Sequence, residues 1–265
     1  MKTTGLTMMI LLVMLQCGFS QEEKNDTTRI KIGNSTILVI GPDTKDYEVV
    51  ADTDDEKFNG HFAGLDLGLN TYLNSSYNMN LNPEDRYLEL NTGKSWGVGV
   101  NFLEKNISFG GNNNAGIVTG LGFEINNYRF NNDILLMHDS SRIYAYDSTG
   151  FDKSKLVATY LTIPIIFEFQ IPAGKKDRKF HFAVGGTGGL KIGSHTKYAY
   201  EINNSMHKDK VREDFHLSPF RYGITARIGY MGINIFANYS LSTLFENNEG
   251  PELYPFTVGL SLVGF

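Results

Sequence analysis

The stretch Ala63-Gly-Leu-Asp-Leu-Gly-Leu-Asn70 alternates an apolar residue with glycine, aspartate or asparagine at every step. A period of two residues is that of a β-strand with one apolar face. The glycines also argue against a helix, in which each would cost ~1 kcal/mol relative to alanine. The stretch therefore predicts a strand whose two faces meet different surroundings.

Seven later stretches follow the same rule, each with an apolar face opposite a face of glycine, threonine, asparagine and charge. They are residues 96–102, 117–126, 161–169, 180–191, 221–230, 233–239 and 256–262. Three residues break the pattern. Ile166 and Phe236 fall on the polar face, and Pro164 lies within a strand, where proline favours a bulge or kink.

The connections between these stretches alternate in length. Residues 71–94, 130–155 and 193–218 are long and 241–254 moderately long, whereas 110–115, 171–178 and 230–232 are short. Long external loops and short periplasmic turns are typical of outer-membrane barrels, whose apolar face points to lipid. A soluble, lipocalin-like barrel would turn the same apolar face inward.

Two features favour the membrane arrangement. The polar face is rich in glycine, which suits a narrow and crowded interior. Aromatic residues lie near strand ends, as they do at membrane interfaces; they are Tyr160, Tyr222, Tyr230, Tyr239 and Phe256. We therefore predict an all-β fold, an eight-stranded antiparallel up-and-down transmembrane β-barrel at residues 59–265. With an even number of strands, we expect both termini in the periplasm.

The N-terminal residues 1–20 read as a signal peptide. They have a positive start, an apolar stretch at 6–15 and small residues, Gly18 and Ser20, before the expected cleavage point. Lipidation of Cys17 is disfavoured because no small residue precedes it. No later stretch has the ~20 consecutive apolar residues of a membrane helix.

Residues 21–58 differ from the rest and are interpreted as a periplasmic segment. Two short apolar stretches at 29–32 and 37–40 flank Gly33-Asn34, which indicates a small hairpin. An acidic linker follows. Its acids lack the D-x-D-x-D-G spacing of a calcium loop, because Lys57 follows Glu56.

Six charged residues fall on the face expected to line the lumen. They are Asp66, Glu124, Glu168, Lys191, Arg221 and Arg227. Bare charges in a tight lumen are costly, so pairing is expected. Strand direction places Glu168 and Arg227 near the periplasmic end, and Lys191 and Arg221 near the outer end within reach of Glu124. We expect a network that fills the lumen rather than a pore, with separate hydrated charges as the alternative.

Motifs for catalysis, metal or cofactor binding are weak. His138-Asp139-Ser140-Ser141 lies in a long loop, where such residues meet by chance, and a triad is recognised by geometry. His195, His207 and His216 lack ligand-like spacing. The glycines at 185–189 have no Gly-Lys-Ser/Thr after them. The net charge of −5 gives no footprint for nucleic acid. We expect no enzyme, cofactor or metal.

The start at Gln21-Glu-Glu-Lys-Asn, the Leu161-Thr-Ile-Pro-Ile segment and the end Val258-Gly-Leu-Ser-Leu-Val-Gly-Phe265 resemble outer-membrane β-barrel proteins of Bacteroidetes, the PorT-like and OmpX-like small barrels. The resemblance covers roughly residues 58–265. It implies insertion by the outer-membrane assembly machinery, with Phe265 as the recognition signal. The terminal residue is one position out of phase with the apolar face of the last strand.

Three hypotheses for function remain open at this point. The first is a non-enzymatic barrel in contact with outer-membrane lipid, whose external loops present a binding or protective surface. The second is a component of an envelope secretion or assembly complex, which would act on a protein partner through residues 21–58. The third is a lipid-modifying outer-membrane enzyme, for which His138 and Ser141 would be the candidate residues.

Overall fold

The computed structural model describes residues 27–32, 35–40, 58–109, 113–147, 151–174 and 178–263. The chain divides into two units, Met1–Glu56 and Lys57–Phe265. In the first unit, β1 (Thr27–Ile32) and β2 (Ser35–Ile40) pair antiparallel, with Thr27 opposite Ile40. The predicted signal peptide, the acidic linker and Phe265 lie outside the described residues.

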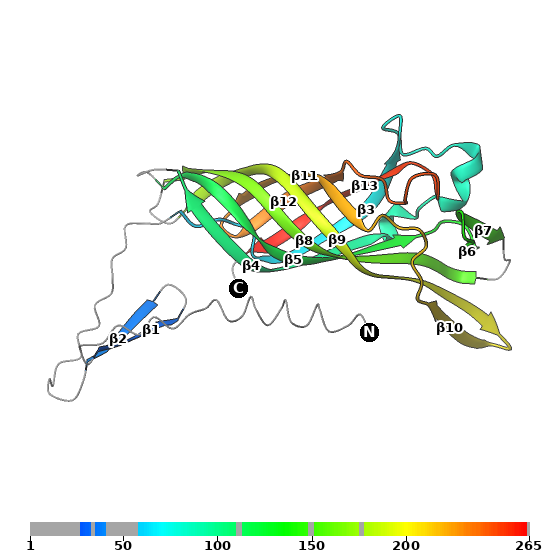
Figure 1. Cartoon of the computed structure of the whole chain (residues 1–265), viewed down its shortest axis with the longest axis horizontal. Coiled ribbons are helices and arrows are strands. Elements are labelled where there is room, and N and C mark those ends of the chain that lie inside the picture. The colour runs from blue at the N-terminus through cyan, green and yellow to red at the C-terminus, as the bar shows by residue number, and fades with distance from the viewer. Residues whose placement is uncertain are drawn as a thin grey trace. The chain divides into compact units, whose positions relative to one another are not determined.

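The second unit is a closed antiparallel barrel of eight strands, which confirms the predicted architecture (Figure 1). The strands are β3 (Gly64–Asn74), β4 (Trp96–Ser108), β5 (Ala115–Arg129), β8 (Phe151–Pro172), β9 (Lys179–Ile202), β11 (Phe220–Tyr230), β12 (Ile233–Ser240) and β13 (Leu253–Val263). Each strand pairs with the next along the chain. The last strand, β13, pairs with β3, so that Val263 lies opposite Gly64 and the sheet closes.

Short connections gather at one end of the barrel, here called the turn end. Between β11 and β12, Met231 and Gly232 both have positive φ, 50° and 82°. This is the pattern of a type I′ turn, whose twist matches that of the two strands it joins. At the second position of the turn, Gly232 adopts its positive φ without strain because glycine has no Cβ.

Four long connections gather at the opposite end, here called the loop end. They contain the 3₁₀ turns η1 (Pro83–Leu88) and η2 (Thr92–Lys94), the hairpin of β6 (Ile134–His138) with β7 (Ile143–Asp147), and β10 (Ser205–Val211). A membrane barrel needs ~9–11 residues per strand to span. At 22 and 24 residues, β8 and β9 continue well beyond the barrel wall, and β10 pairs with the extension of β9.

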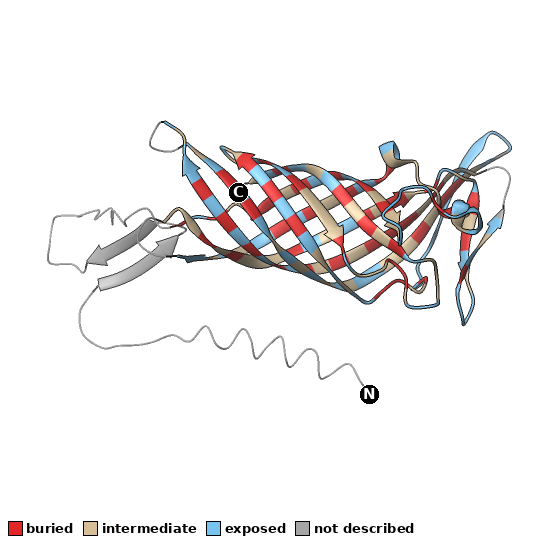
Figure 2. Cartoon of the chain, turned by 90° about the horizontal axis from the view of Figure 1, so that it is seen from above, coloured by how far each residue is buried: buried red, intermediate tan, exposed pale blue. Residues whose placement is uncertain are grey.

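The two faces of the sheet differ in the manner the alternation predicts (Figure 2). Large apolar side chains are exposed all round the outer surface; Ile235, for example, is 60% exposed. The inner face carries glycine and buried polar groups, among them Asn70, Asn126 and Thr225. An apolar belt of this extent requires lipid rather than water around it. Among the described residues, no helix is long and apolar enough to cross a membrane.

The residues that broke the sequence pattern have structural roles. Ile166 and Phe236 point into the barrel and are buried, at 1% and 3% exposed. A bulge or kink was predicted at Pro164, and no bulge forms there, because Pro164 keeps its register opposite Thr187 on β9. The pairing of β8 with β5 is interrupted between Thr162 and Ile165, and the Pro164 carbonyl accepts a hydrogen bond from Thr119 Oγ1. Among the paired residues, the register shifts instead between Asn101 and Leu103 on β4, and on β8 between Thr159 and Tyr160 and between Phe151 and Lys153.

Candidate functional site

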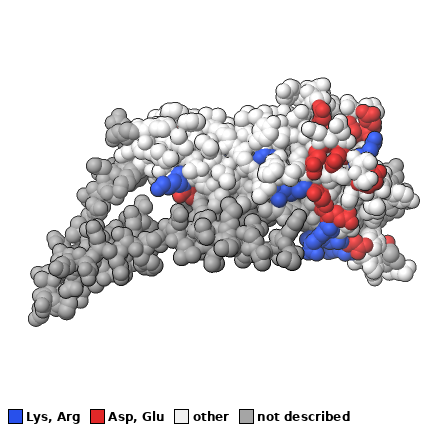
Figure 3. Space-filling view, viewed as in Figure 1, with Lys and Arg blue, Asp and Glu red and all other residues white. Residues whose placement is uncertain are grey.

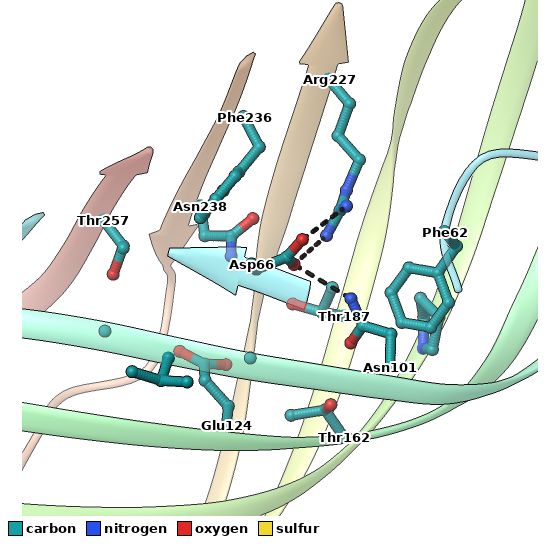
Figure 4. Close-up of a pocket in the computed structure, with 14 residues that line it drawn as sticks. Phe62, Asp66, Asn101, Glu124, Thr162, Thr187, Arg227, Phe236, Asn238 and Thr257 are labelled. Carbon is teal, nitrogen blue, oxygen red and sulfur yellow. Dashed lines mark hydrogen bonds and ion pairs between the residues drawn. The ribbon is translucent and has the colours of Figure 1, made fainter. Parts of the chain in front are cut away.

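An ion pair crosses the lumen. Asp66 on β3 and Arg227 on β11 lie three strands apart around the barrel, and Arg227 Nη2 is 2.7 Å from Asp66 Oδ2. A second contact joins Nη1 and Oδ1 at 3.3 Å, and Asn101 Nδ2 donates to Asp66 Oδ2 at 3.0 Å (Figure 4). Both charged side chains are more than nine-tenths buried. The pair therefore ties opposite walls of the barrel together.

Aromatic rings complete the surroundings of the arginine. The guanidinium of Arg227 lies over the rings of Phe62 and Phe236, at 5.2 and 5.5 Å from their centroids. Both rings present their faces to the cation, an arrangement that is stabilising when the group is desolvated. Phe236, an exception to the sequence pattern, thus has a reason to face inward.

Of the other charges expected in the lumen, Glu124 forms an ion pair with Arg221. The Arg221 guanidinium also lies over the ring of Tyr160, 4.3 Å from its centroid. Lys191 is bonded to Asp214 and to the carbonyl of Leu217, both in the long connection before β11. The structure therefore groups these charges as separate pairs.

Glu168 and Arg227 were expected to share the same end of the barrel as partners, and that pairing was wrong. Arg227 takes Asp66, and Glu168 takes His61, whose Nδ1 lies 2.6 Å from Glu168 Oε1. The physical reason is that the chain before β3 enters the lumen and brings its own partner for the buried carboxylate.

Residues 58–62, here called the plug, fill the turn end of the lumen. Phe58, assigned to the linker from sequence, is 4% exposed and packs in one apolar cluster with Phe62, Val118, Ile166 and Ala183. A side chain in place of Gly116 would meet the Phe58 ring, because its Cβ would lie 2.5 Å from Cε1. Glycine at this position makes room for the plug.

Hydrogen bonds hold the backbone of the plug to the wall. His61 N donates to Glu168 Oε2 at 3.0 Å, and Phe62 N donates to Glu104 Oε2 at 2.7 Å. Gln170 Nε2 donates both to the carbonyl of Asn59 and to Glu168 Oε1. A buried backbone group needs such partners, and two carboxylates of the wall supply several of them.

The imidazole of His61 stacks on that of His181, a strand residue of β9, with ring centroids 3.8 Å apart and 6° between the planes. His181 Nε2 donates to Asn234 Oδ1, and Asn234 Nδ2 in turn donates to the carbonyl of His61. Gly229 lies against the side chains of His181 and Asn234, which leave no room for a Cβ at this position. The plug is therefore fitted to the wall on two sides.

The long connections close the loop end with an apolar core of their own, here called the cap. All four connections and the adjoining strand ends contribute to it. Its fully buried members include Leu88, Tyr128, Ile134, Leu136, Ile143, Tyr160, Phe215, Leu217, Leu244 and Phe245. Tyr198 OH, on the extension of β9, donates to the carbonyl of Leu136. The loops are thus a packed body, which periodicity in the sequence did not reveal.

Little space remains between the plug and the cap. The cavity beside Asp66 and Arg227 has a volume of about 30 Å³ (Figure 4), enough for one or two water molecules. Among the described side chains, Asn238 Oδ1 and Arg227 Nε have no hydrogen-bond partner, so water in this cavity has polar groups to bind. The lumen is filled rather than open.

A larger cleft of about 420 Å³ opens on the cap, between the connections that follow β3, β5 and β12. Glu84, Asp85 and Glu252 line it together with Arg142 and Tyr87. The pKa of Asp85 is raised, chiefly by burial and to a smaller extent by the neighbouring charge of Glu84. The pKa of Tyr87 is raised to about 12, chiefly by burial and to a smaller extent by the charge of Asp85. Figure 3 shows acidic side chains gathered over this end of the barrel.

His138 and His216 contact a carboxylate and a backbone carbonyl of the loops. His138 Nε2 lies 2.7 Å from Glu213 Oε2, and His216 Nε2 donates to the carbonyl of Asp139. Among the described residues, neither histidine ring is hydrogen-bonded to the hydroxyl of Ser141, and the backbone N–H of Ser141 donates to Asp139 Oδ1. Nor do the described residues contain a group of three metal-ligating side chains.

These features define a class of protein, a small membrane β-barrel with an apolar outer belt and a lumen filled by side chains. The sequence profile of the outer membrane protein beta-barrel domain matches residues 63–246. The chain belongs to this family and is an outer-membrane β-barrel protein. No curated protein matches the chain at a significant level.

The ion pair across the lumen predicts a strong coupling energy. Removing one partner of a buried pair leaves an unpaired charge and costs ~3–5 kcal/mol. We expect Asp66→Asn and Arg227→Met each to lower the free energy of unfolding, and the double variant to lose much less than the sum. Urea unfolding in phospholipid vesicles measures all four proteins. Additive losses would show that the two side chains are not coupled.

The plug predicts a second effect on stability. We expect Glu168→Ala to lower the unfolding temperature of the refolded barrel by ~5–10 °C, because three donors, His61 N, His61 Nδ1 and Gln170 Nε2, lose this carboxylate as their acceptor. Glu201→Ala, at an exposed position on the extension of β9, is the matched control and should leave the temperature unchanged. An unaltered value for Glu168→Ala would mean that the plug is not held by this carboxylate.

Proposed function

We propose that this protein is a non-enzymatic outer-membrane barrel whose cap faces the outside of the cell and presents a binding surface. The cap itself is the observation that carries the proposal. A barrel needs only short turns to close, whereas this chain builds a packed apolar core from all four long connections. Binding residues are commonly found on loops held by a rigid scaffold.

The filled lumen supports a role for the surface rather than for transport. A plug held by hydrogen bonds, an ion pair across the lumen and the cap leave small cavities, of about 30 and 20 Å³, among the described residues of the lumen. Solutes larger than water have no room in such a space. The belt of exposed apolar residues is in turn the surface that outer-membrane lipid would contact.

Within the cap, we propose the acidic cleft as the place where a ligand binds. Three carboxylates and one guanidinium line it, so a ligand that carries positive charge would be favoured. Clefts of several hundred Å³ are the usual form of a ligand site. We also propose a closer relation to the PorT-like and OmpX-like barrels, supported by the C-terminal stretch, with Phe265 as the signal for the assembly machinery.

Orientation is tested with single cysteines, since Cys17 is the one cysteine of the chain. Ser141→Cys places a thiol at the loop end and Arg178→Cys places one at the turn end. We expect a membrane-impermeant maleimide to label Ser141→Cys on intact cells, and Arg178→Cys only after the outer membrane is broken. The reverse result would contradict the outward cap.

Ligand binding at the cleft is tested with pentalysine as the probe, by fluorescence anisotropy on the refolded full chain. We expect Glu84→Gln/Glu252→Gln to weaken binding about 10-fold or more, whereas Glu201→Gln, away from the cleft, leaves it unchanged. Because the pKa of Asp85 is raised, its charge is lost at a higher pH than that of an ordinary aspartate. The affinity for pentalysine should therefore fall as the pH is lowered and Asp85 is protonated. Equal affinities for wild type and cleft variant would refute the site.

A further inference from the structure

A cleft opens in the outer wall of the barrel where β12 stops short of its neighbours. With 8 residues, β12 is the shortest barrel strand. Its last pair with β11 joins Ser240 to Gly223, and its last pair with β13 involves Tyr239. The N–H groups of residues 241 and 242 then both donate to the Tyr222 carbonyl, so the chain leaves the ladder. The starts of β11 and β13 continue on either side of the gap.

This cleft, here called the rim cleft, has a volume of about 440 Å³. The starts of β11 and β13 form its sides, and the connection from β12 to β13 forms the rest. Its lining residues are Ser218, Pro219, Phe220, Tyr222, Leu241, Ser242, Thr243, Glu246, Asn247 and Tyr254. It shares none of these with the acidic cleft of the cap. The two clefts are therefore separate sites.

The rim cleft lies at the loop-end edge of the apolar belt. Phe220 and Tyr222 are exposed, and they lie on the same face of β11 as the belt residue Ile224. On the other side of the cleft, the ring of Tyr254 lies 6.4 Å from that of Tyr239. Aromatic residues gathered at the end of the apolar belt are typical of a membrane–water interface. The cleft is therefore at the height of lipid headgroups.

The belt is shallow next to the rim cleft. Ala226 of β11 lies directly opposite Ala237 of β12, and both are on the outward face. Their neighbours on the adjoining strands are the larger and exposed Val184 and Val258. Two methyl groups side by side therefore leave a depression in the belt. Ala237 is four residues from Leu241 of the cleft, ~13 Å along the strand, a distance that one acyl chain spans.

The chemistry of the rim cleft suits a cation. Glu246 is half-buried, and none of the described residues forms an ion pair with it. No lysine or arginine is among the described residues that line the cleft. Its aromatic walls, Phe220, Tyr222 and Tyr254, favour a cation over their faces. A carboxylate makes a strong hydrogen bond with an ammonium group. The cleft therefore favours an ammonium group and disfavours an anion.

We propose that the rim cleft binds a lipid whose headgroup carries a primary ammonium group. The ammonium donates to the Glu246 carboxylate between the aromatic walls, and the Asn247 amide donates to the phosphate of the headgroup. One acyl chain lies over Ala226 and Ala237. A lipid presents its ammonium and its chain together, which matches the cleft and the depression beside it. The site does not depend on the function proposed above, nor on which way the cap faces.

The test is calorimetric titration of the refolded full chain in non-ionic maltoside micelles. The four probes are short-chain phosphatidylethanolamine, its N-acetylated form, phosphatidylglycerol with the same chains, and free ethanolamine. We expect phosphatidylethanolamine to bind at least ~10-fold more tightly than the other three, because it alone presents both an ammonium group and acyl chains. Glu246→Gln should lower its affinity to that of the N-acetylated lipid.

A second variant, Ala226→Leu/Ala237→Leu, fills the depression and should weaken binding of phosphatidylethanolamine ~5-fold or more, because the chain loses its close contacts. Glu201→Gln removes an exposed carboxylate far along β9 and is the matched control, which should keep the wild-type affinity. Every variant is first shown to be folded by its heat-modifiable gel mobility.

Three results would overturn the proposal. The first is binding of the N-acetylated lipid, phosphatidylglycerol or free ethanolamine as tight as that of phosphatidylethanolamine. The second is undiminished binding of phosphatidylethanolamine by Glu246→Gln or by the double leucine variant. The third is an absence of binding by the wild-type protein.

Discussion

Closure of the sheet between β13 and β3 is the constraint on which the rest of the structure depends. In lipid, every backbone N–H and C=O must find a partner within the protein, so a sheet with a free edge cannot span. Pairing of Leu253–Val263 with Gly64–Asn74 removes the last edges. Closure also forces one face of each strand into a narrow interior, where only small residues, paired charges and a few rings fit.

The interior then has to be filled and neutralised. Asp66 and Arg227 neutralise each other across the lumen, and Phe62 and Phe236 cover the guanidinium. At the turn end, the plug supplies His61 to Glu168 and an apolar ring, Phe58, to the wall. At the loop end, the cap replaces solvent over the strand ends. The same structure that seals the barrel therefore creates the rigid surface proposed to bind a ligand.

Much of this fold could be predicted from the sequence, because strand alternation and connection length are local signals. Which charges pair could not, because pairing depends on register around a closed sheet: Glu168 was matched with Arg227 although each has another partner. The plug carries no alternating pattern, so Phe58 read as linker. The cap core gathers residues such as Leu88 and Phe215 from separate loops, and no spacing along the chain reveals such a set. The bulge expected at Pro164 lies elsewhere.

The central claim is that the barrel is sealed, and electrical recording from planar bilayers tests it most directly. The refolded full chain, inserted at the level of single barrels, is held under a steady voltage in concentrated potassium chloride. A lumen with a cavity of about 30 Å³ between plug and cap predicts no stable unitary conductance. Stable, stepwise currents of uniform size from the wild-type protein would contradict the account.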